Sequence, residues 1–168
     1  MAIDFSEEML SEHPDECGVV KAALDFNEAN TFARIKDFMP DAIVSASALQ
    51  WSTNLAWAFE RIAALGIPFS LALFTSNTFR TLHETAGIQS PIHSHETILK
   101  AAECFGSCDV DTGRYELSFE NTRDMLYYIK RSGVSGGDAQ LSFTQVRRLI
   151  QEYPRDCLEF EVVYLGSR

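Results

Sequence analysis

One segment organises the whole sequence: Asp41-Ala42-Ile43-Val44-Ser45-Ala46-Ser47-Ala48-Leu49-Gln50-Trp51. Its first half is a short apolar, β-branched run after Pro40, which predicts a strand buried on both faces of a sheet. We expect the strand to end near Ser45, where small residues lead on to Gln50 and Trp51. Ligands of open α/β sheets bind just beyond the carboxyl ends of strands, so this bend is predicted to line a site.

A helix and a second strand are predicted directly after this bend. The N-cap residues of Ser52-Thr53-Asn54 precede apolar side chains at helical spacing from Leu55 to Leu65. Gly66 ends that helix, and the apolar run from Ile67 to Phe74 predicts a parallel strand. A strand, a turn, a helix and a strand in this order are the unit of an α/β fold.

The remaining segments give shorter elements of both kinds. Strands are predicted over 2–4, 18–24, 114–119 and 158–165, and helices after Ser6, over 32–38, over 78–85, after Ser94 to 103, after Asn121 to 131 and after Ser142 to 152. Residues 132–137 form a Gly/Ser loop. Two late strands joined by a long helical connection are typical of an antiparallel sheet edge.

Length and charge limit the class of protein. A chain of 168 residues with 46% hydrophobic content predicts one domain over 1–168. The net charge of −10 argues against a nucleic-acid or anionic-membrane surface, and an acidic protein partner would need a local basic patch. No apolar run is long enough to cross a bilayer, and the acidic first ten residues lack the basic start of a signal peptide. We therefore expect a cytoplasmic protein.

Metal and acid–base motifs are not apparent. Cys104 and Cys108 lack a second ligand pair, and the side chains of His93 and His95, two residues apart, point in different directions. The four cysteines are therefore interpreted as unreactive or structural thiols, and no metal site is predicted. A nucleophile elbow and a phosphate-binding loop are also absent from the sequence.

Several blocks together resemble a class I S-adenosylmethionine-dependent methyltransferase, and more narrowly the malonyl-acyl-carrier-protein O-methyltransferase family of biotin synthesis. The resemblance covers nearly all of the chain, and the matching blocks are Ala2-Ile3-Asp4-Phe5-Ser6 with Met9-Leu10, Asp41 to Ser45 with Leu49-Gln50-Trp51, Phe74-Thr75, Leu82-His83-Glu84, Met125-Leu126 with Ile129-Lys130 and Gly133, Leu141-Ser142 with Gln145, Tyr153-Pro154 and Phe160 to Gly166. The C-terminal blocks are the more family-specific ones.

The resemblance implies transfer of a methyl group from S-adenosylmethionine to the free carboxylate of a malonyl thioester on acyl carrier protein, the partner. It implies a Rossmann-like sheet with an antiparallel C-terminal edge. It assigns cofactor binding to Asp4, Phe5, Asp25, Phe26, Ser45 and Ala46. Substrate binding is predicted, from their positions, for Gln50, Trp51, His83, Lys130 and Arg131. A carboxylate acceptor is already ionised at pH 7, so no catalytic acid or base is predicted.

The sequence departs from the family at its start. None of the nine glycines forms the Gly-x-Gly-x-Gly turn that ends the family's first strand, so we expect an N-terminally truncated, partial domain. In the family's strand order, 3-2-1-4-5-7-6, that strand lies between the strands at 2–4 and 41–45. We therefore expect residues 1–38 to cover the edge of 41–45 or to be exposed and mobile, or another chain or self-association to pair there.

Alternatives stay open for several residues and for the function. Lys130 and Arg131 suit a solvated helix end, where cations are favourable, and the alternative is contact with a carboxylate or an acidic carrier. Asp4 also suits a helix start, and His83 a structural role. The alternative functions are a non-catalytic methyltransferase remnant or binding subunit, and a methyltransferase for another small carboxylic acid.

Overall fold

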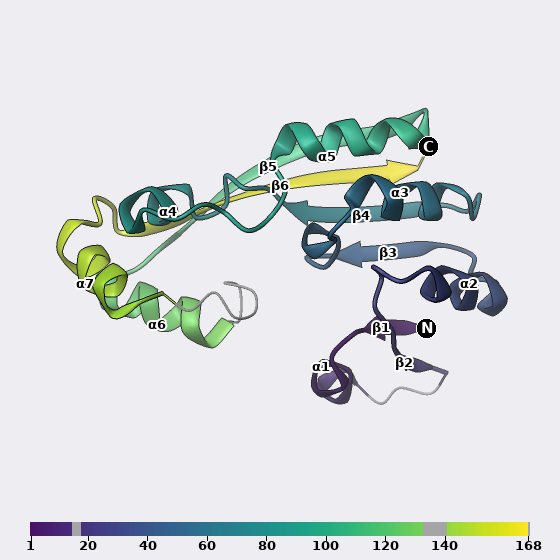
Figure 1. The fold of residues 1–168 in the computed structure, drawn as a ribbon, viewed down its shortest axis with the longest axis horizontal. Helices are drawn as coiled ribbons and strands as arrows, with labels where there is room; N and C mark the ends of the chain where they lie inside the picture. Colours follow the sequence, from purple (N-terminus) through teal and green to yellow (C-terminus); the bar gives the residue numbers. More distant parts are fainter. Residues whose placement is uncertain (15–17, 133–140, 168) are drawn as a thin grey trace.

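The computed structural model describes residues 1–14, 18–132 and 141–167, in which six strands form two sheets (Figure 1). In the smaller sheet β1 (Ala2–Asp4) pairs in parallel with β2 (Lys21–Ala23). The larger sheet has the order β3 (Ile43–Ala46), β4 (Phe69–Phe74), β6 (Cys157–Ser167) and β5 (Cys108–Ser118). β3 and β4 are parallel, whereas β6 is antiparallel to both of its neighbours. The predicted α/β fold with an antiparallel C-terminal edge is confirmed.

Several of the helices begin where the sequence offers caps. The helices are α1 (Glu7–Glu12), α2 (Ala29–Phe38), the 3₁₀ turn η1 (Leu49–Trp51), α3 (Leu55–Ala63), α4 (Arg80–Ala86), α5 (His95–Ala102), the 3₁₀ turn η2 (Glu103–Phe105), α6 (Thr122–Ser132) and α7 (Phe143–Glu152). Ser6, Asn54, Ser94 and Ser142 each accept a hydrogen bond from the amide three residues later. Each of these side chains satisfies one of the free amides at a helix start.

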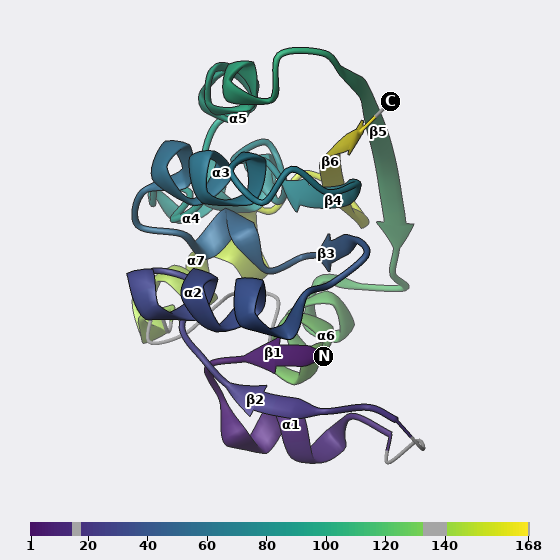
Figure 2. The ribbon, with the colours of Figure 1, turned by 90° about the vertical axis from the view of Figure 1, so that its right-hand side faces the viewer.

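A first hydrophobic cluster lies between the larger sheet and the helices α2, α3 and α5, which cover one side of it (Figure 2). Phe59, Leu73 and Ile98 are fully buried there. Phe32 of α2 packs edge-on against Trp57 of α3, with ring centroids 5.4 Å apart. This packing holds α2 against the body of the molecule although β1 and β2 belong to the other sheet.

A second cluster lies at the other end of the molecule, around α4, α6 and α7. Met125, Leu149 and Leu158 are its most buried members. β5 and β6 pair over eleven residues, and this long ribbon runs from one cluster to the other (Figure 1). β6 contributes Val163 to the first cluster and Leu158 to the second.

Three predicted boundaries are wrong by three residues or more. β5 begins at Cys108 instead of residue 114, because hydrogen bonding to β6 imposes a strand on residues with low strand propensity. The second strand spans only Lys21–Ala23, and α2 begins three residues earlier than predicted. The predicted 132–137 loop lies largely outside the described residues.

The two sheets are separated between β1 and β3. β1 lies beyond β3 on the side away from β4 (Figures 1 and 2), but no described strand pairs with β3 there. Residues 1–38 instead keep the order that the family's sheet would give them, so the expectation that they cover this edge is wrong. Burial on both faces is also wrong: Ile43 packs on the first cluster, whereas Val44 faces the other side and is 80% exposed.

Candidate functional site

A cavity of about 620 Å³ lies where β1 and β3 end. Asp4, the last residue of β1, and Ala46, the last residue of β3, both line it. The amide N–H of Ser6 donates to Oδ1 of Asp4 at 2.9 Å, which fixes the orientation of that carboxylate. A cavity of this size is typical of small-molecule sites and lies at the edge of the sheet that the sequence predicted.

The segment after α4 forms one wall of the cavity. It contributes Ile88, Gln89, Ser90, Pro91 and Ile92. The wall is tied at its end because the His93 ring bonds through Nε2 to the carbonyl of Ser52 at 2.7 Å. The amide of Ser76 also donates to the carbonyl of His93 at 2.8 Å. These bonds connect the wall to the ends of η1 and β4.

Another part of the cavity is apolar. Phe79 and Leu82 come from the start of α4, Ile129 from α6, and Leu141 from the residues before α7. All four belong to or pack against the second cluster. The cavity therefore adjoins the second cluster, and its apolar part can exclude water from a bound ligand.

Polar atoms without partners gather at this cavity. Among the described residues, four buried side-chain polar atoms have no hydrogen-bond partner. Three of them belong to cavity-lining residues: Oε1 of Gln50, Nδ1 of His83 and Oγ of Ser90. Buried polar groups in folded proteins are almost always paired, so such a group points to a ligand that completes it.

The charges at the cavity are few. Among the described lining residues, Asp4 is the only one with a side chain charged at pH 7, because burial lowers the pKa of His83 and keeps its imidazole neutral. A neutral imidazole offers one donor and one acceptor. The cavity thus combines one carboxylate, neutral hydrogen-bonding groups and an apolar wall.

Two cavity-lining residues have a strained backbone. Ser47 has φ +57° and Phe79 has φ +58°, in the left-handed region that side chains rarely adopt. The amide of Ser47 donates to the carbonyl of Ala72 at 2.9 Å, and that of Phe79 to the carbonyl of Glu159 at 2.8 Å. Such strain costs about 1–3 kcal/mol per residue and collects at functional sites.

The structure brings together about half of the predicted site residues. Asp4, Ala46, Gln50, Trp51 and His83 line the cavity. The others are not among its lining residues. These are Phe5, which is 68% exposed, Asp25, Phe26 and Ser45, which are partly buried, and Lys130 and Arg131, which are exposed at the end of α6.

Sequence reasoning missed Ser47, Ser90 and Gln145. Ser47 was within the predicted bend but had no motif of its own. Ser90 lies between two predicted helices, and Gln145 is named only in a block that matches the family. An unpaired buried hydroxyl such as that of Ser90 becomes visible only in three dimensions.

A separate polar cluster lies outside the cavity, around the buried Glu161 of β6. Its Oε1 accepts from Oγ1 of Thr75 at 2.9 Å and Nδ2 of Asn77 at 2.8 Å, and its Oε2 accepts from Nε of Arg114 at 2.8 Å. Burial raises the pKa of Glu161, but these hydrogen bonds and the arginine outweigh it and hold the pKa below its ordinary value. The cluster fixes β6 to the end of β4 and to β5.

Two features are absent from the described part of the chain. No three or more His, Cys, Asp or Glu side chains are arranged there to hold a metal ion. No helix there combines the length and the apolar character needed to cross a membrane. Cys17 lies outside the described residues, and Cys104, Cys108 and Cys157 are free thiols.

Comparison with known proteins finds relatives in sequence. The malonyl-[acyl-carrier protein] O-methyltransferase of Chlorobium phaeovibrioides is 28% identical over 120 residues, which cover 68% of this chain and 46% of that protein. The protein of the same name from Chlorobium luteolum is 30% identical over 105 residues, 58% of this chain and 40% of that protein. The chain thus spans less than half the length of these relatives. No protein-family model matches the sequence.

The fold has a solved counterpart. A protein described as a methyltransferase from Bacillus halodurans C-125 superposes with a TM-score of 0.58 at 13% identity, over 98% of this chain and 80% of its own. At this identity the likeness concerns the fold alone. The chain therefore resembles the malonyl-[acyl-carrier protein] O-methyltransferases in sequence and has the Rossmann-like fold of class I S-adenosylmethionine-dependent methyltransferases.

Proposed function

We propose that this chain takes part in the S-adenosylmethionine-dependent methylation of a small carboxylate, the free carboxylate of a malonyl thioester on acyl carrier protein. The observation that carries the proposal is the cavity at the ends of β1 and β3, with one carboxylate and three unpaired polar atoms among its described lining residues. The sequence similarity to malonyl-[acyl-carrier protein] O-methyltransferases supports the choice of acceptor.

The residues present fit the cofactor. Asp4 offers an oriented carboxylate at a strand end, the position from which class I folds accept hydrogen bonds from ribose hydroxyls. Ala46 and Ser47 at the end of β3 leave room for a ligand beside the backbone. When bound, S-adenosylmethionine supplies a methyl group activated by a cationic sulfonium.

The acceptor would be held by neutral groups. Nε2 of Gln50, the hydroxyl of Ser90 and the neutral imidazole of His83 can each donate a hydrogen bond to a carboxylate oxygen, whereas the unpaired Oε1 of Gln50 can only accept a bond from a donor group of a ligand. The apolar wall of Phe79, Leu82 and Ile129 excludes water, which leaves the carboxylate more nucleophilic than in solution. No proton has to be removed, so this chain's contribution is alignment and desolvation.

Calorimetric titration tests the first step. We expect the wild-type chain to bind S-adenosylmethionine, and Asp4→Asn to weaken binding about tenfold through loss of a charged hydrogen-bond acceptor. Asp41→Asn, at an exposed position outside the cavity, is the matched control. If the wild type gives no heat at millimolar cofactor, the chain alone is not an enzyme and the non-catalytic binding subunit becomes the better hypothesis.

Acceptor choice requires a second assay. We expect methyl transfer to malonyl-acyl carrier protein and not to free dicarboxylic acids. Equal or faster transfer to a free acid would assign the chain to the methyltransferases of other small acids instead.

We also propose that a strand of another chain, a second copy in the simplest case, pairs with the free edge of residues 41–45. The support is the absence of any described strand on that edge together with the 80% exposure of Val44, since open strand edges associate readily. Val44→Lys should abolish such association in sedimentation velocity, whereas Val20→Lys, at another exposed apolar residue, should not. A wild type that remains monomeric at high concentration would refute pairing with a second copy.

A further inference from the structure

The helices α6 and α7 carry a charge opposite to that of the chain. Together they hold five cations and two carboxylates, a formal net charge of +3 within a chain of net charge −10. Among the described residues, Arg123, Lys130 and Arg147 have no ion-pair partner, whereas Arg148 pairs with Glu152 at 2.9 Å. These unpaired charges leave a positive surface on an otherwise acidic molecule.

Exposed apolar side chains lie among these cations. Phe143, Arg147 and Ile150 follow at positions i, i+4 and i+7, so they share one face of α7, opposite the buried Leu149. Phe143 is 83% exposed and Ile150 is 42% exposed. A phenylalanine left in water beside free cations is typical of a protein-binding surface.

The outer face of α6 repeats the pattern. Tyr127 is 61% exposed, and the guanidinium of Arg131 lies over its ring at 5.5 Å. Nη1 of Arg131 also donates to Oη of Tyr127 at 3.3 Å. Because Met125 and Ile129 face the second cluster, Tyr127 and Arg131 are left for a partner.

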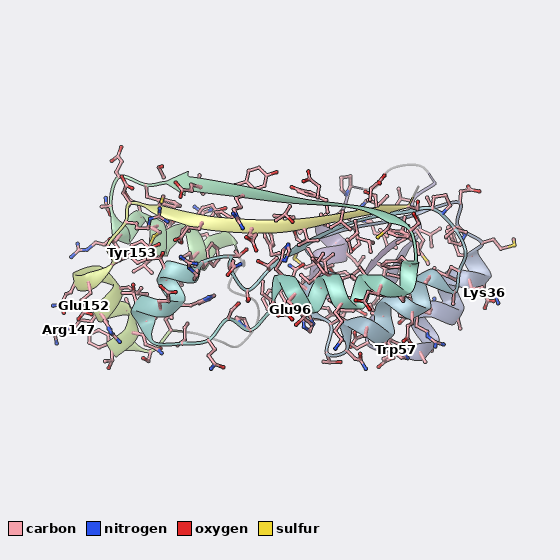
Figure 3. The ribbon with its side chains drawn as sticks, turned by 90° about the horizontal axis from the view of Figure 1, so that it is seen from above. Lys36, Trp57, Glu96, Arg147, Glu152 and Tyr153 are labelled. Atoms are coloured by element: carbon pink, nitrogen blue, oxygen red, sulfur yellow. The ribbon has the colours of Figure 1, made fainter. Side chains whose placement is uncertain are left out.

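This surface adjoins the cavity. Ile129 lines the cavity and is followed directly by the exposed Lys130 and Arg131, and Gln145 lines it two residues before Arg147. Figure 3 shows Arg147 at the end of the molecule that carries α7, far from Lys36 on α2. A macromolecule bound to α6 and α7 would therefore lie beside the cavity.

We infer that the α6–α7 surface, formed by Tyr127, Lys130, Arg131, Phe143, Arg147 and Ile150, is the docking site of an acidic carrier protein. The inference rests on the proposed function and adds to it the place where the partner binds. The positive charge of this surface favours an acidic partner. The adjoining cavity favours a partner whose reactive group is attached through a flexible linker that can reach into the cavity. The exposed aromatic rings would supply the apolar anchors of the interface.

Fluorescence anisotropy with labelled apo-acyl carrier protein tests the surface without any methyl transfer. We expect Arg147→Glu to raise Kd about tenfold and Phe143→Ala about fivefold. The matched controls, Lys36→Glu and Met39→Ala, change an exposed cation and an exposed apolar side chain at the other end of the molecule and should stay within about twofold. Binding of the wild type should also weaken as salt rises from about 0.05 to 0.5 M.

Three results would overturn the inference: no carrier binding, equal effects of variants and controls, or a wild-type dimer that Arg147→Glu dissociates without any carrier binding. Methyl transfer to malonyl-pantetheine, which has no carrier, tests the proposed function separately. Carrier binding that responds to Arg147→Glu without methyl transfer overturns the proposed function and leaves the surface in place. If methyl transfer occurs but Arg147→Glu does not change carrier binding, the α6–α7 surface is refuted as the docking site and the proposed function stands.

Discussion

Replacement of Gln50 by methionine should make the protein more stable and a poorer binder. Gln50 is 3% exposed, and its Oε1 has no hydrogen-bond partner among the described residues. A buried unpaired acceptor costs about 1–3 kcal/mol, and methionine fills a similar volume without one. With a urea m-value of about 2 kcal/mol/M, the unfolding midpoint should rise by about 0.5–1.5 M.

Gln50→Met should also weaken binding of the methyl acceptor, the carboxylate substrate. A hydrogen bond to a carboxylate contributes about 1.5–3 kcal/mol, so loss of the Gln50 amide should raise the acceptor's Kd about 10- to 100-fold. Urea unfolding and calorimetric titration measure the two effects. Gln151→Met, on an exposed position of α7, is the control and should change stability by less than about 0.5 kcal/mol. A Gln50→Met protein that is less stable than the wild type, or that binds the acceptor equally well, would refute the assignment of Gln50 to a ligand site.

Three further predictions concern the framework of the site. Ser142→Ala removes the bond from the amide of Gln145 to Oγ of Ser142, one of the two bonds of the capping box, and should lower the free energy of unfolding by about 1 kcal/mol in urea titration; an unchanged midpoint would show that the cap is not needed. Folding lowers the pKa of Glu161, so the stabilisation that this carboxylate provides is present above its unfolded pKa of about 4.3 and is lost as the pH falls through the lower folded pKa. The urea midpoint of Glu161→Gln should therefore depend less on pH in this acid range than the midpoint of the wild type. Parallel pH curves for the two proteins would contradict the role of the hydrogen bonds of Glu161. Asn27 accepts hydrogen bonds from N and Oγ1 of Thr53 at 2.9 and 3.1 Å, so Asn27→Ala should speed amide exchange in β1 and β2 more than in β4; uniform exchange changes would mean that this link does not hold the small sheet.

The sequence predicted the elements well where local signals are strong. The caps at Ser6, Asn54, Ser94 and Ser142 and the apolar run before Phe74 are local features, and each led to the observed helix or strand. The start of β5 was missed because residues 108–113 become a strand only through pairing with β6. Exposure of Val44 was missed because burial depends on what covers the second face of a sheet.

The approximate position of the site was predicted because strand ends are local features of the sequence. Strand ends mark the cavity, so the bend from Ser45 to Trp51 was predicted from its position, whereas Asp4 and Ala46 were assigned through the family resemblance. Ser90 and Ile129 reach the cavity through the tertiary arrangement of α4 and α6, which no sequence spacing encodes. Lys130 and Arg131 have the charge expected of carboxylate ligands, but they lie outside the cavity on the α6–α7 surface.

The ribbon of β5 and β6 has a mechanical consequence. The two halves of the molecule share it as a common spine, and the cavity is bounded by side chains from both halves. Bending of the β5–β6 ribbon near Glu159 to Glu161 would change the distance between the two halves and therefore the width of the cavity. A ligand that touches both halves would damp this motion, and the central amides of β6 would then exchange with solvent more slowly.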